Sequence, residues 1–522
     1  MKLRKVYSKT NTRRIICANI TDGKTKAGES VRSGEIVTAA LEGGGTIDFV
    51  YDANAPRGGM KHTFFTPDRK YAVQFFNDPE DGMNPNIQDR IRTIVGVYNP
   101  TLSEERGGAR GNTEKTAEYF RSRFCWPVAI VSRPEFGIVC PAYPKRFFFG
   151  DGASTAGLNL KGKDKKSNWF TGRMRKYISP GELGDFRTML SAAICLSRSV
   201  RRMHQAGLAH SDLSCNNVLI DPQTGSTVVI DIDSLVVPGK YPPEVCGTKG
   251  YIAPEVLATL EYDPGDSRRR LPCVSTDLHA LPVLIYEYLF LRHPLMGPKV
   301  YSTASAEEDD FLGMGPMATF IEDPTDRSNR PPDLGVTIQS LSKGLEKLFL
   351  RAFVDGLHDP SERPTAMEWE SELLKAWDRL RRCDNPRCDR KWFILRDEND
   401  PVCPFCRTRV TDRIITLTLK SVVRGKKGIY RDCGEVVVND QTPLYDWHVY
   451  SNVHNDEKAG TDMRAYICRH RGLWLLVNNG VEGMTSPTGR LVPKGQAIEL
   501  RDGAVFRMTD RENGLLCEVS VH

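Results

Sequence analysis

Residues 210–233 concentrate side chains whose types and spacing could do chemistry. They read HSDLSCNN, followed by an apolar run, the turn DPQTGS and the strand VVIDID. Asp212 falls at the end of a turn, Asn217 follows five residues later, and a hairpin returns Asp231 beside them. Phosphoryl transfer needs little covalent help from a protein. It needs a carboxylate that orients a hydroxyl and oxygen ligands that hold magnesium, and these residue types could supply both.

This stretch resembles the catalytic loop and the metal-binding segment of protein kinases. The resemblance implies that Asp212 orients the attacking hydroxyl and that Asn217 and Asp231 hold magnesium. Asp233 replaces the glycine of the kinase metal-binding motif. Alternation along a strand would put Asp231 and Asp233 on one face, so that two carboxylates could share the metal ions. A lone His-x-Asp would favour a capped turn with a solvated carboxylate, but here further motifs follow in order.

Three further segments resemble protein kinases in the expected order. They are GTKGYIAPE at 247–255, which resembles the substrate-binding end of the activation segment, Asp277 at the start of a buried helix, and PSERP at 360–364, which resembles the late arginine motif. The resemblance implies an ion pair between Glu255 and Arg363 and a catalytic loop that Asp277 holds through backbone hydrogen bonds. It also implies that Thr248 faces Asp212, as in kinases that act on serine or threonine.

Two residues of the catalytic loop depart from the kinase pattern. Ser211 replaces the arginine that reads activation-loop phosphate, and Ser214 replaces a lysine of the catalytic loop. Ordinary control by activation-loop phosphorylation is therefore not expected. The resemblance is to an atypical kinase that lacks the arginine before its catalytic aspartate.

A glycine-rich turn and one lysine are the candidates for binding ATP phosphates. Gly43, Gly44 and Gly45 resemble a phosphate loop, in which absent side chains let backbone N–H groups approach the nucleotide, although a triple glycine is as often a plain hairpin turn. The strand KYAVQFF carries Gln74 where kinases carry the phosphate-pairing lysine. Lys61 is the best substitute, either because MKHTFF is itself the matching strand or because a neighbouring strand supplies the charge. The alternative is a solvated lysine at a strand end.

The carboxylate partner of this lysine is expected on the helix before PVAIV. Glu114 and Glu118 share one face of that helix at i, i+4 spacing, and counting back from Pro127 favours Glu118. A solvated pair of glutamates is the alternative. Ala142 and Tyr143, at the end of the strand-rich region, complete the predicted nucleotide site.

The elements that must position these residues predict an α+β, bilobal, protein-kinase-like domain over 36–378. Its sheet lobe extends to about residue 143 and combines β-rich runs, broken by glycines, with two helical stretches. The chain then becomes helical. Residues 181–205 carry apolar side chains at helical spacing, and residues 276–291 are apolar enough to be buried all round.

Four cysteines after this domain predict a zinc ribbon over 379–410. Cys383 and Cys388 have four residues between them, fourteen residues follow, and Cys403 and Cys406 have two residues between them. Two such pairs can place four thiolates tetrahedrally about zinc, and a site with no open position is structural. The alternative is four free buried thiols.

The remaining residues, 411–522, predict an all-β sandwich, because alternating strands and turn signals follow one another. They resemble forkhead-associated (FHA) domains in SNVH at 451–454, in Asn479-Gly480 and in LVPKGQAIELRDGAVFRM. The Gly-Arg pair usual in that family is not evident. A sandwich that docks a partner is therefore favoured over a phosphopeptide reader.

The four parts together resemble the bacterial kinase component of a tellurium-resistance-associated phosphorylation triad. That resemblance implies a metal-dependent protein phosphatase and a von Willebrand factor A domain protein as partners, besides a protein substrate. It implies ATP and Mg²⁺ as cofactors, with structural Zn²⁺. The rival hypothesis is a pseudokinase scaffold that binds nucleotide without transferring phosphate. A small-molecule phosphotransferase is disfavoured, because APE and the late arginine resemble a platform for protein substrates.

Composition excludes other classes of protein. The chain has 522 residues and a net charge of +6, an excess that the basic tail, residues 1–35, supplies within its first fourteen residues, so nucleic acid is not an expected partner. The longest apolar run, 280–291, is too short to cross a membrane. The start of the chain lacks the apolar core of a signal peptide, and the 14 cysteines are mostly scattered singly, which favours the cytoplasm.

Overall fold

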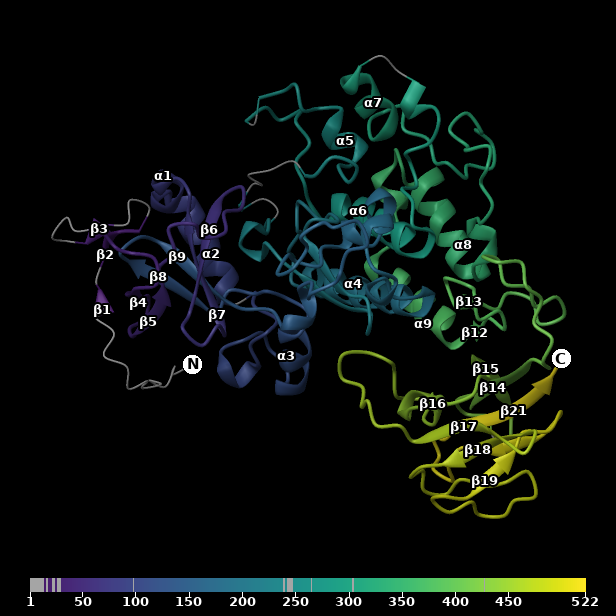
Figure 1. Ribbon diagram of the computed structural model, residues 1–522. Helices are drawn as coiled ribbons and strands as arrows, with labels where there is room; N and C mark the ends of the chain where they lie inside the picture. The colour runs from purple at the N-terminus through teal and green to yellow at the C-terminus, as the bar shows by residue number, and fades with distance from the viewer. Residues whose placement is uncertain are drawn as a thin grey trace.

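The computed structural model arranges the chain from a sheet lobe, through a helical lobe, to a cysteine-rich connection and a β-sandwich (Figure 1). The described residues are 14–15, 17–20, 24–25, 30–96, 98–237, 240–241, 247–263, 265–302, 305–426 and 428–522. Most of the predicted basic tail lies outside them. Within it, β1 (Arg14–Ile15) pairs in parallel with β4, and β2 (Cys17–Asn19) pairs with β3 (Lys24–Thr25).

The sheet lobe is built on seven strands in the order β1-β4-β5-β6-β7-β9-β8, and β4 also pairs with β8. The strands after β1 are β4 (Ile36–Leu41), β5 (Thr46–Val50), β6 (Lys61–Phe65), β7 (Tyr71–Phe76), β8 (Ala129–Arg133) and β9 (Gly137–Pro141). Buried side chains alternate along β4, β5 and β6, because successive residues of a strand face opposite sides. Phe49, Phe64 and Phe75 pack together in the resulting core.

Of the next three helices, α1 and α2 contact this sheet, and α3 packs elsewhere. The helices are α1 (Pro79–Met83), α2 (Pro85–Val95) and α3 (Glu114–Arg121). Ile87 and Ile91 of α2 pack with Phe76 of β7, whereas Phe120 of α3 belongs to the core of the helical lobe. The expectation that both helical stretches serve the sheet lobe therefore holds for α2 alone. The pattern of apolar residues predicts which face of a helix is buried, but it does not predict whether the sheet or the helical lobe covers that face.

The helical lobe is organised around α4 (Phe186–Gln205) and α6 (Val274–Phe290). Asp185 and Thr188 form a capping box that starts α4, since the Asp185 side chain accepts from the Thr188 N–H at 3.0 Å. The remaining elements are β10 (Val218–Asp221), β11 (Ser226–Val229), α5 (Pro254–Leu257), α7 (Ala306–Gly313), α8 (Lys343–Leu350) and α9 (Ala366–Asp378). The two buried helices thus carry the hairpin β10–β11 and the loops around it.

Arg390 is one of the residues through which the cysteine-rich connection packs on the helical lobe. Strands β12 (Leu380–Arg382) and β13 (Trp392–Ile394) pair at its base. Arg390 donates to the carbonyl of Leu289, in the last turn of α6, at 2.8 Å, and its guanidinium lies 5.4 Å from the Phe186 ring and 5.1 Å from the Phe405 ring. Burial, together with the positive charge of Arg175, lowers the pKa of Arg390 to about 9. The partial negative charge at the end of α6 favours a cation at this position.

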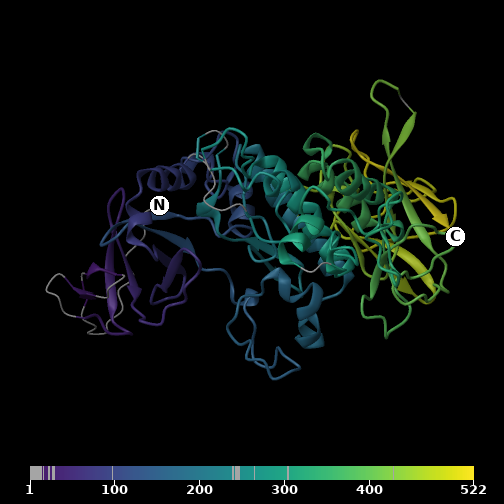
Figure 2. The ribbon, with the colours of Figure 1, turned by 90° about the horizontal axis from the view of Figure 1, so that it is seen from above.

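The C-terminal region forms two four-stranded antiparallel sheets, which Figures 1 and 2 show at the end of the molecule opposite the sheet lobe. One sheet has the order β15-β14-β21-β20 and the other β16-β17-β18-β19. Their strands are β14 (Ile415–Val422), β15 (Tyr430–Val437), β16 (Thr442–Leu444), β17 (Ala465–His470), β18 (Leu473–Asn478), β19 (Ala497–Glu499), β20 (Val505–Arg507) and β21 (Leu516–Val521). Leu417 of the first sheet and Leu476 of the second share one core, so the predicted sandwich architecture is present.

An ion-pair network, which we call the arginine junction, joins the sandwich to the helical lobe. Glu370 of α9 accepts from Arg198 Nε and from Arg201 Nε of α4, each at 2.6 Å. Arg201 also donates to Glu457 of the sandwich at 2.7 Å, and Arg198 to the carbonyl of Asn455 at 2.8 Å. Because the Glu370 side chain is only 7% exposed, the network ties three segments distant in sequence together without much water.

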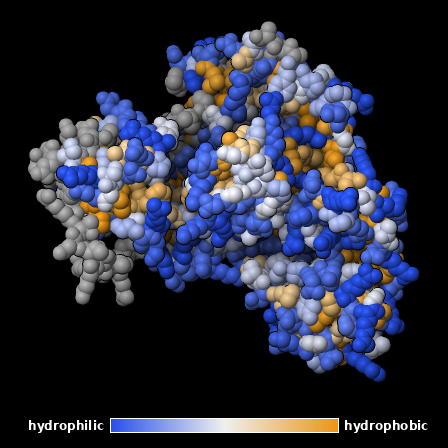
Figure 3. Space-filling view, viewed as in Figure 1, coloured by the Kyte–Doolittle hydropathy of each residue, from blue (hydrophilic) through white to orange (hydrophobic). Residues whose placement is uncertain are grey.

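Hydrophilic residues dominate the face of the molecule in Figure 3, with apolar residues in small groups. Among the described helices, none combines the length and the apolar character needed to cross a bilayer.

Candidate active site

The predicted catalytic loop forms a connected cluster around Asp212. Asn217 Nδ2 donates to the Asp212 carbonyl at 2.8 Å and to Asp212 Oδ2 at 2.9 Å. Thr248 Oγ1 donates to the other carboxylate oxygen at 2.6 Å. These bonds fix the direction of the Asp212 carboxylate, and they confirm the expectation that Thr248 faces it.

The β10–β11 hairpin brings Asp231 beside this cluster. The two strands pair from Val218 with Val229, and the Ile230 N–H donates to the Asn217 carbonyl at 3.0 Å. The next residue, Asp231, has φ 59° and exposes its carboxylate. A left-handed conformation is uncommon for residues other than glycine, and such strain gathers at functional sites, where the surrounding structure holds it. Ser211, next to Asp212, has φ 64°.

The segment after Asp231 is a 3-10 turn, Ile232–Ser234, and not a strand. The expected alternation of Asp231 and Asp233 on one strand face is therefore absent. Asp231 is exposed, whereas the Asp233 side chain is only 7% exposed and forms an ion pair with Lys61. The turn thus directs the two carboxylates into different surroundings.

Lys61, the first residue of β6, lies in this cluster with a side chain that is 10% exposed. Burial alone would lower the pKa of Lys61, but the negative charges of Asp233 and Asp231 outweigh burial and hold the pKa above its usual range. Strand β7, which carries Gln74, hydrogen-bonds directly to β9, and β6 is its other neighbour. Lys61 therefore lies on the strand next to the one that carries Gln74.

Glu118 does not reach this cluster. It is exposed on α3, whose Phe120 packs into the helical lobe and whose Tyr119 hydroxyl accepts from Arg198 at 3.2 Å. The other glutamate of the predicted pair, Glu114, lies 2.8 Å from Arg121. Lys61 has Asp233 as its carboxylate partner because α3 packs on α4 and not on the sheet.

The three glycines form the tip of the β4–β5 hairpin, and all three have positive φ. The Leu41 N–H donates to the Gly45 carbonyl at 3.1 Å, which closes a tight turn that a residue with Cβ would strain. Glu42 binds Arg92 of α2 with two oxygens, the shorter contact being 2.7 Å. The base of this turn is thus attached to the helix that packs on the sheet.

Ala142 and Tyr143 follow β9 directly. The Ala142 N–H donates to the Lys70 carbonyl at 2.9 Å. Burial raises the pKa of Tyr143, and so do the negative charges of Asp164 and Asp231. The influence of Asp231 shows that the end of the sheet lobe and the predicted metal ligand share one region.

The supporting ion pair and backbone contacts agree with expectation. Arg363 binds both oxygens of Glu255, at 2.7 and 2.8 Å. Asp277 accepts from the backbone N–H of His210 at 2.7 Å and contacts His204 Nε2 at 3.1 Å. The catalytic loop is therefore attached to the buried end of α6.

Two contacts at the candidate site were not foreseen from the sequence, the pair Lys61–Asp233 and the pair Glu42–Arg92. Their members lie 172 and 50 residues apart. A local sequence pattern reveals contacts within one helix or hairpin. Neither of these two pairs lies within one helix or hairpin, so neither produces such a pattern. The unusual Asp at the glycine position of the metal-binding motif was the available signal for the first pair.

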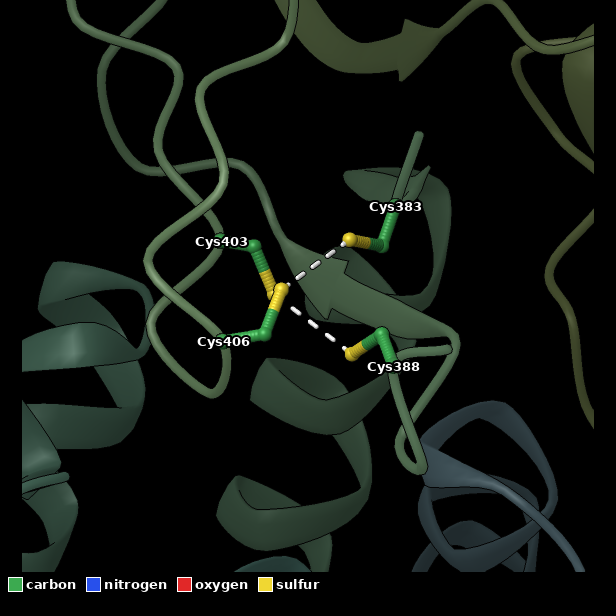
Figure 4. Close-up of side chains that lie close together, drawn as sticks. All are labelled: Cys383, Cys388, Cys403 and Cys406. Carbon is green, nitrogen blue, oxygen red and sulfur yellow. Dashed lines mark hydrogen bonds between the residues drawn. The ribbon is translucent and has the colours of Figure 1, made fainter. Parts of the chain in front are cut away.

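The four cysteines form a second candidate site (Figure 4). Their ligand atoms all lie within 4.8 Å of one another. Cys383 Sγ lies 3.5 Å from Cys406 Sγ, and Cys388 Sγ lies 3.9 Å from Cys403 Sγ. Tetrahedral zinc with Zn–S bonds of about 2.3 Å requires sulfur atoms about 3.8 Å apart. The cluster therefore has the donors and the spacing for a closed metal site.

Comparison with known proteins connects the first site to one family. Residues 171–372 match the family model of the protein kinase domain. Over 125 residues the chain is 32% identical to "Protein kinase C epsilon type" of Rattus norvegicus, an alignment that covers 23% of this chain and 14% of that protein. Over 194 residues it is 27% identical to "cAMP-dependent protein kinase type 3" of Saccharomyces cerevisiae, an alignment that covers 36% of this chain and 40% of that protein.

Two further matches have the same character. "Atypical protein kinase C" of Drosophila melanogaster is 33% identical over 120 residues, which cover 22% of this chain and 18% of that protein. The solved structure titled "Crystal structure of Toxoplasma gondii specific rhoptry antigen kinase domain" aligns at 15% identity and a TM-score of 0.37, covering 67% of this chain and 88% of that one. The chain spans between 14% and 40% of the length of the three curated relatives. The family similarity lies in residues 171–372, which match the protein kinase domain.

Proposed function

We propose that this chain is an atypical serine/threonine protein kinase that transfers the γ-phosphoryl group of ATP to a protein substrate in a signalling or stress-response system. The observation that carries the proposal is the cluster of Asp212, Asn217 and Thr248, with Asp231 beside it. The hydrogen bond of 2.6 Å from Thr248 to Asp212 supports a hydroxyl acceptor, because it shows that this carboxylate can accept from a hydroxyl group.

The donors fit magnesium. The side-chain amide nitrogen of Asn217 donates to Asp212, so the side-chain carbonyl oxygen of Asn217 points away from Asp212. Asp231 is exposed. Carboxylate and amide oxygens are hard ligands of the kind Mg²⁺ binds. When bound, Mg²⁺ neutralises charge on the phosphates of ATP.

The chain's own residues then have distinct tasks. Asp212 orients the substrate hydroxyl and accepts its proton, and Lys61 supplies positive charge to the phosphates. The glycines 43–45 offer backbone N–H groups without side chains, and Ala142 with Tyr143 lines the nucleotide site. The hydroxyl oxygen forms the new bond to phosphorus, and the bond to the leaving ADP oxygen breaks.

The C-terminal sandwich and the cysteine cluster are proposed as docking and structural modules. The FHA-like motifs support a partner-binding role for the sandwich, and the resemblance to the tellurium-associated triad suggests a metal-dependent phosphatase and a von Willebrand factor A domain protein as partners. The four-thiolate geometry supports structural zinc.

The test is transfer of labelled γ-phosphate from ATP and Mg²⁺ to the chain itself and to a generic protein acceptor. Wild type is expected to transfer phosphate and Asp212→Asn to lose at least about 100-fold, in line with the loss of one positioned acid–base group. Lys61→Ala is expected to lose transfer mainly through weaker ATP binding. Retained transfer by Asp212→Asn would contradict the mechanism.

A pseudokinase scaffold is the second candidate, favoured by Gln74, Ser211 and Ser214 at positions where kinases carry charged residues. It predicts Mg²⁺-dependent ATP binding without transfer, also when the proposed partners are added.

A further inference from the structure

The ion pair between Lys61 and Asp233 is an enclosed charged contact at the candidate active site. The Lys61 side chain is 10% exposed and that of Asp233 7% exposed. The Phe76 ring lies 5.7 Å from Lys61 Nζ, and Cys140 of β9 is close enough to affect the charge of the amine. An ammonium group with apolar neighbours needs a nearby carboxylate, because a buried charge without a partner is strongly destabilising.

The other carboxylates around the sheet lobe have different partners. Glu118 is exposed on α3, which packs on the helical lobe. The acidic residue of α2, Asp89, accepts from the Tyr241 hydroxyl and lies 3.9 Å from Lys240 Nζ. Glu42, next to the glycine turn, binds Arg92. Among the described residues around β6, Asp233 is thus the carboxylate that directly holds Lys61.

The backbone separates Asp233 from its neighbour Asp231. Asp231 adopts φ 59° and exposes its carboxylate, and the 3-10 turn Ile232–Ser234 then carries Asp233 into the buried space below β6. The two carboxylates consequently differ in exposure, and Asp233 is paired with a lysine from a different lobe.

We propose that Asp233 is a positioning residue, which holds Lys61 in the cleft for the phosphates of ATP, and that it is not a magnesium ligand. The contact joins the sheet lobe to the helical lobe, so it also sets the distance between Lys61 and the catalytic loop. This inference rests on the proposed function, because that function assigns Lys61 to ATP phosphates.

The experiment measures equilibrium binding of MgATP and of adenosine to the full chain by calorimetry, for wild type, Asp233→Asn, Lys61→Met and the double variant. Asp233→Asn is expected to weaken MgATP about tenfold or more and to leave adenosine binding within about twofold, because a lost charge-assisted hydrogen bond has about this effect and adenosine has no phosphates. In the Lys61→Met background, Asp233→Asn is expected to add little, since it acts through Lys61. Asp233→Glu, which keeps the charge, is expected to recover part of the lost affinity.

Several results would overturn the inference. The first is an unchanged affinity of Asp233→Asn for MgATP, and the second is an equal loss of affinity for adenosine. The third is an effect of Asp233→Asn that stays undiminished in the Lys61→Met background and that excess Mg²⁺ relieves, because this result would make Asp233 a metal ligand. Glu118→Gln tests the carboxylate that the sequence predicted as the partner of Lys61. A loss of MgATP affinity in Glu118→Gln, with no loss in Asp233→Asn, would also refute the inference. Binding is read without catalysis. A wild-type chain that binds MgATP but transfers no phosphate would therefore refute the proposed activity and leave this test intact.

Discussion

Replacing Glu370 with Gln should destabilise the chain more than any other single charge change on α9. Glu370 accepts from two arginines at 2.6 Å each, and its side chain is 7% exposed. Removing the charge leaves Arg198 without this carboxylate and Arg201 with Glu457 as its remaining carboxylate, and both arginines have poor access to water. Breaking a buried ion pair from one side costs about 3–5 kcal/mol, and the two contacts on Glu370 favour the upper part of that range.

The matched control is Glu372→Gln, two residues along the same helix. Glu372 pairs with Lys375, whose side chain is 67% exposed. Exposed pairs contribute about 0–1 kcal/mol, so this variant should be almost as stable as wild type. Both changes convert one glutamate to glutamine, and they differ only in burial and in the number of arginine partners.

Urea unfolding of the full chain, followed by tryptophan fluorescence, measures the difference. Trp369 is fully buried and precedes Glu370, so this helix contributes one of the seven tryptophans whose emission is followed. With a urea slope of about 3 kcal/mol per molar, a loss of 3–5 kcal/mol lowers the midpoint of the helical-lobe transition by more than about 1 M. Equal midpoints for Glu370→Gln and Glu372→Gln would refute the reasoning that the arginine junction is a stabilising element.

Three further outcomes are expected. Cys403→Ser should abolish metal binding measured by elemental analysis and lower the thermal midpoint, whereas Cys433→Ser, at an exposed thiol of the sandwich, should retain one bound metal ion. Glu287→Gln should flatten the pH dependence of stability, because burial raises the pKa of Glu287 to about 7. The folded wild type keeps a proton that the unfolded chain releases above about pH 4.5, so wild-type stability falls as the pH rises from about 4.5 to 7. An unchanged slope of stability against pH in the variant would contradict this. Arg363→Ala should cost about 3–5 kcal/mol in denaturant unfolding, because it leaves Glu255 without its two-bond partner.

Ordered motifs predicted that Asp212, Asn217 and Asp231 lie close together, because one turn and one hairpin set their spacing, and their catalytic roles stay a prediction. The four-cysteine cluster was predictable for the same reason, since two short pairs must close on one point. Contacts between the sheet lobe and the helices were not predictable in this way. Glu118 was expected beside Lys61 on the basis of helix order, but the sequence does not state whether a helix packs on the sheet lobe or on the helical lobe.

The same limit applies to backbone conformation. A strand ending in Asp-Ile-Asp predicts two carboxylates on one face, yet the left-handed Asp231 starts a 3-10 turn and sends Asp233 elsewhere. Only long-range contacts in the folded chain stabilise such a turn. Strand β11 ends at Val229, so local propensity predicts only the first two residues of VVIDID correctly.

Arg390 has a practical consequence for preparing fragments of this protein. A fragment cut after residue 378 would follow the apparent end of the kinase-like region but would remove the guanidinium that binds the last carbonyls of α6 and lies against Phe186. That cut exposes an apolar ring at the start of α4 and the carbonyl end of the most apolar helix. A soluble catalytic fragment should therefore extend through residue 410, so that the recombinant boundary follows packing and not the limits of sequence similarity.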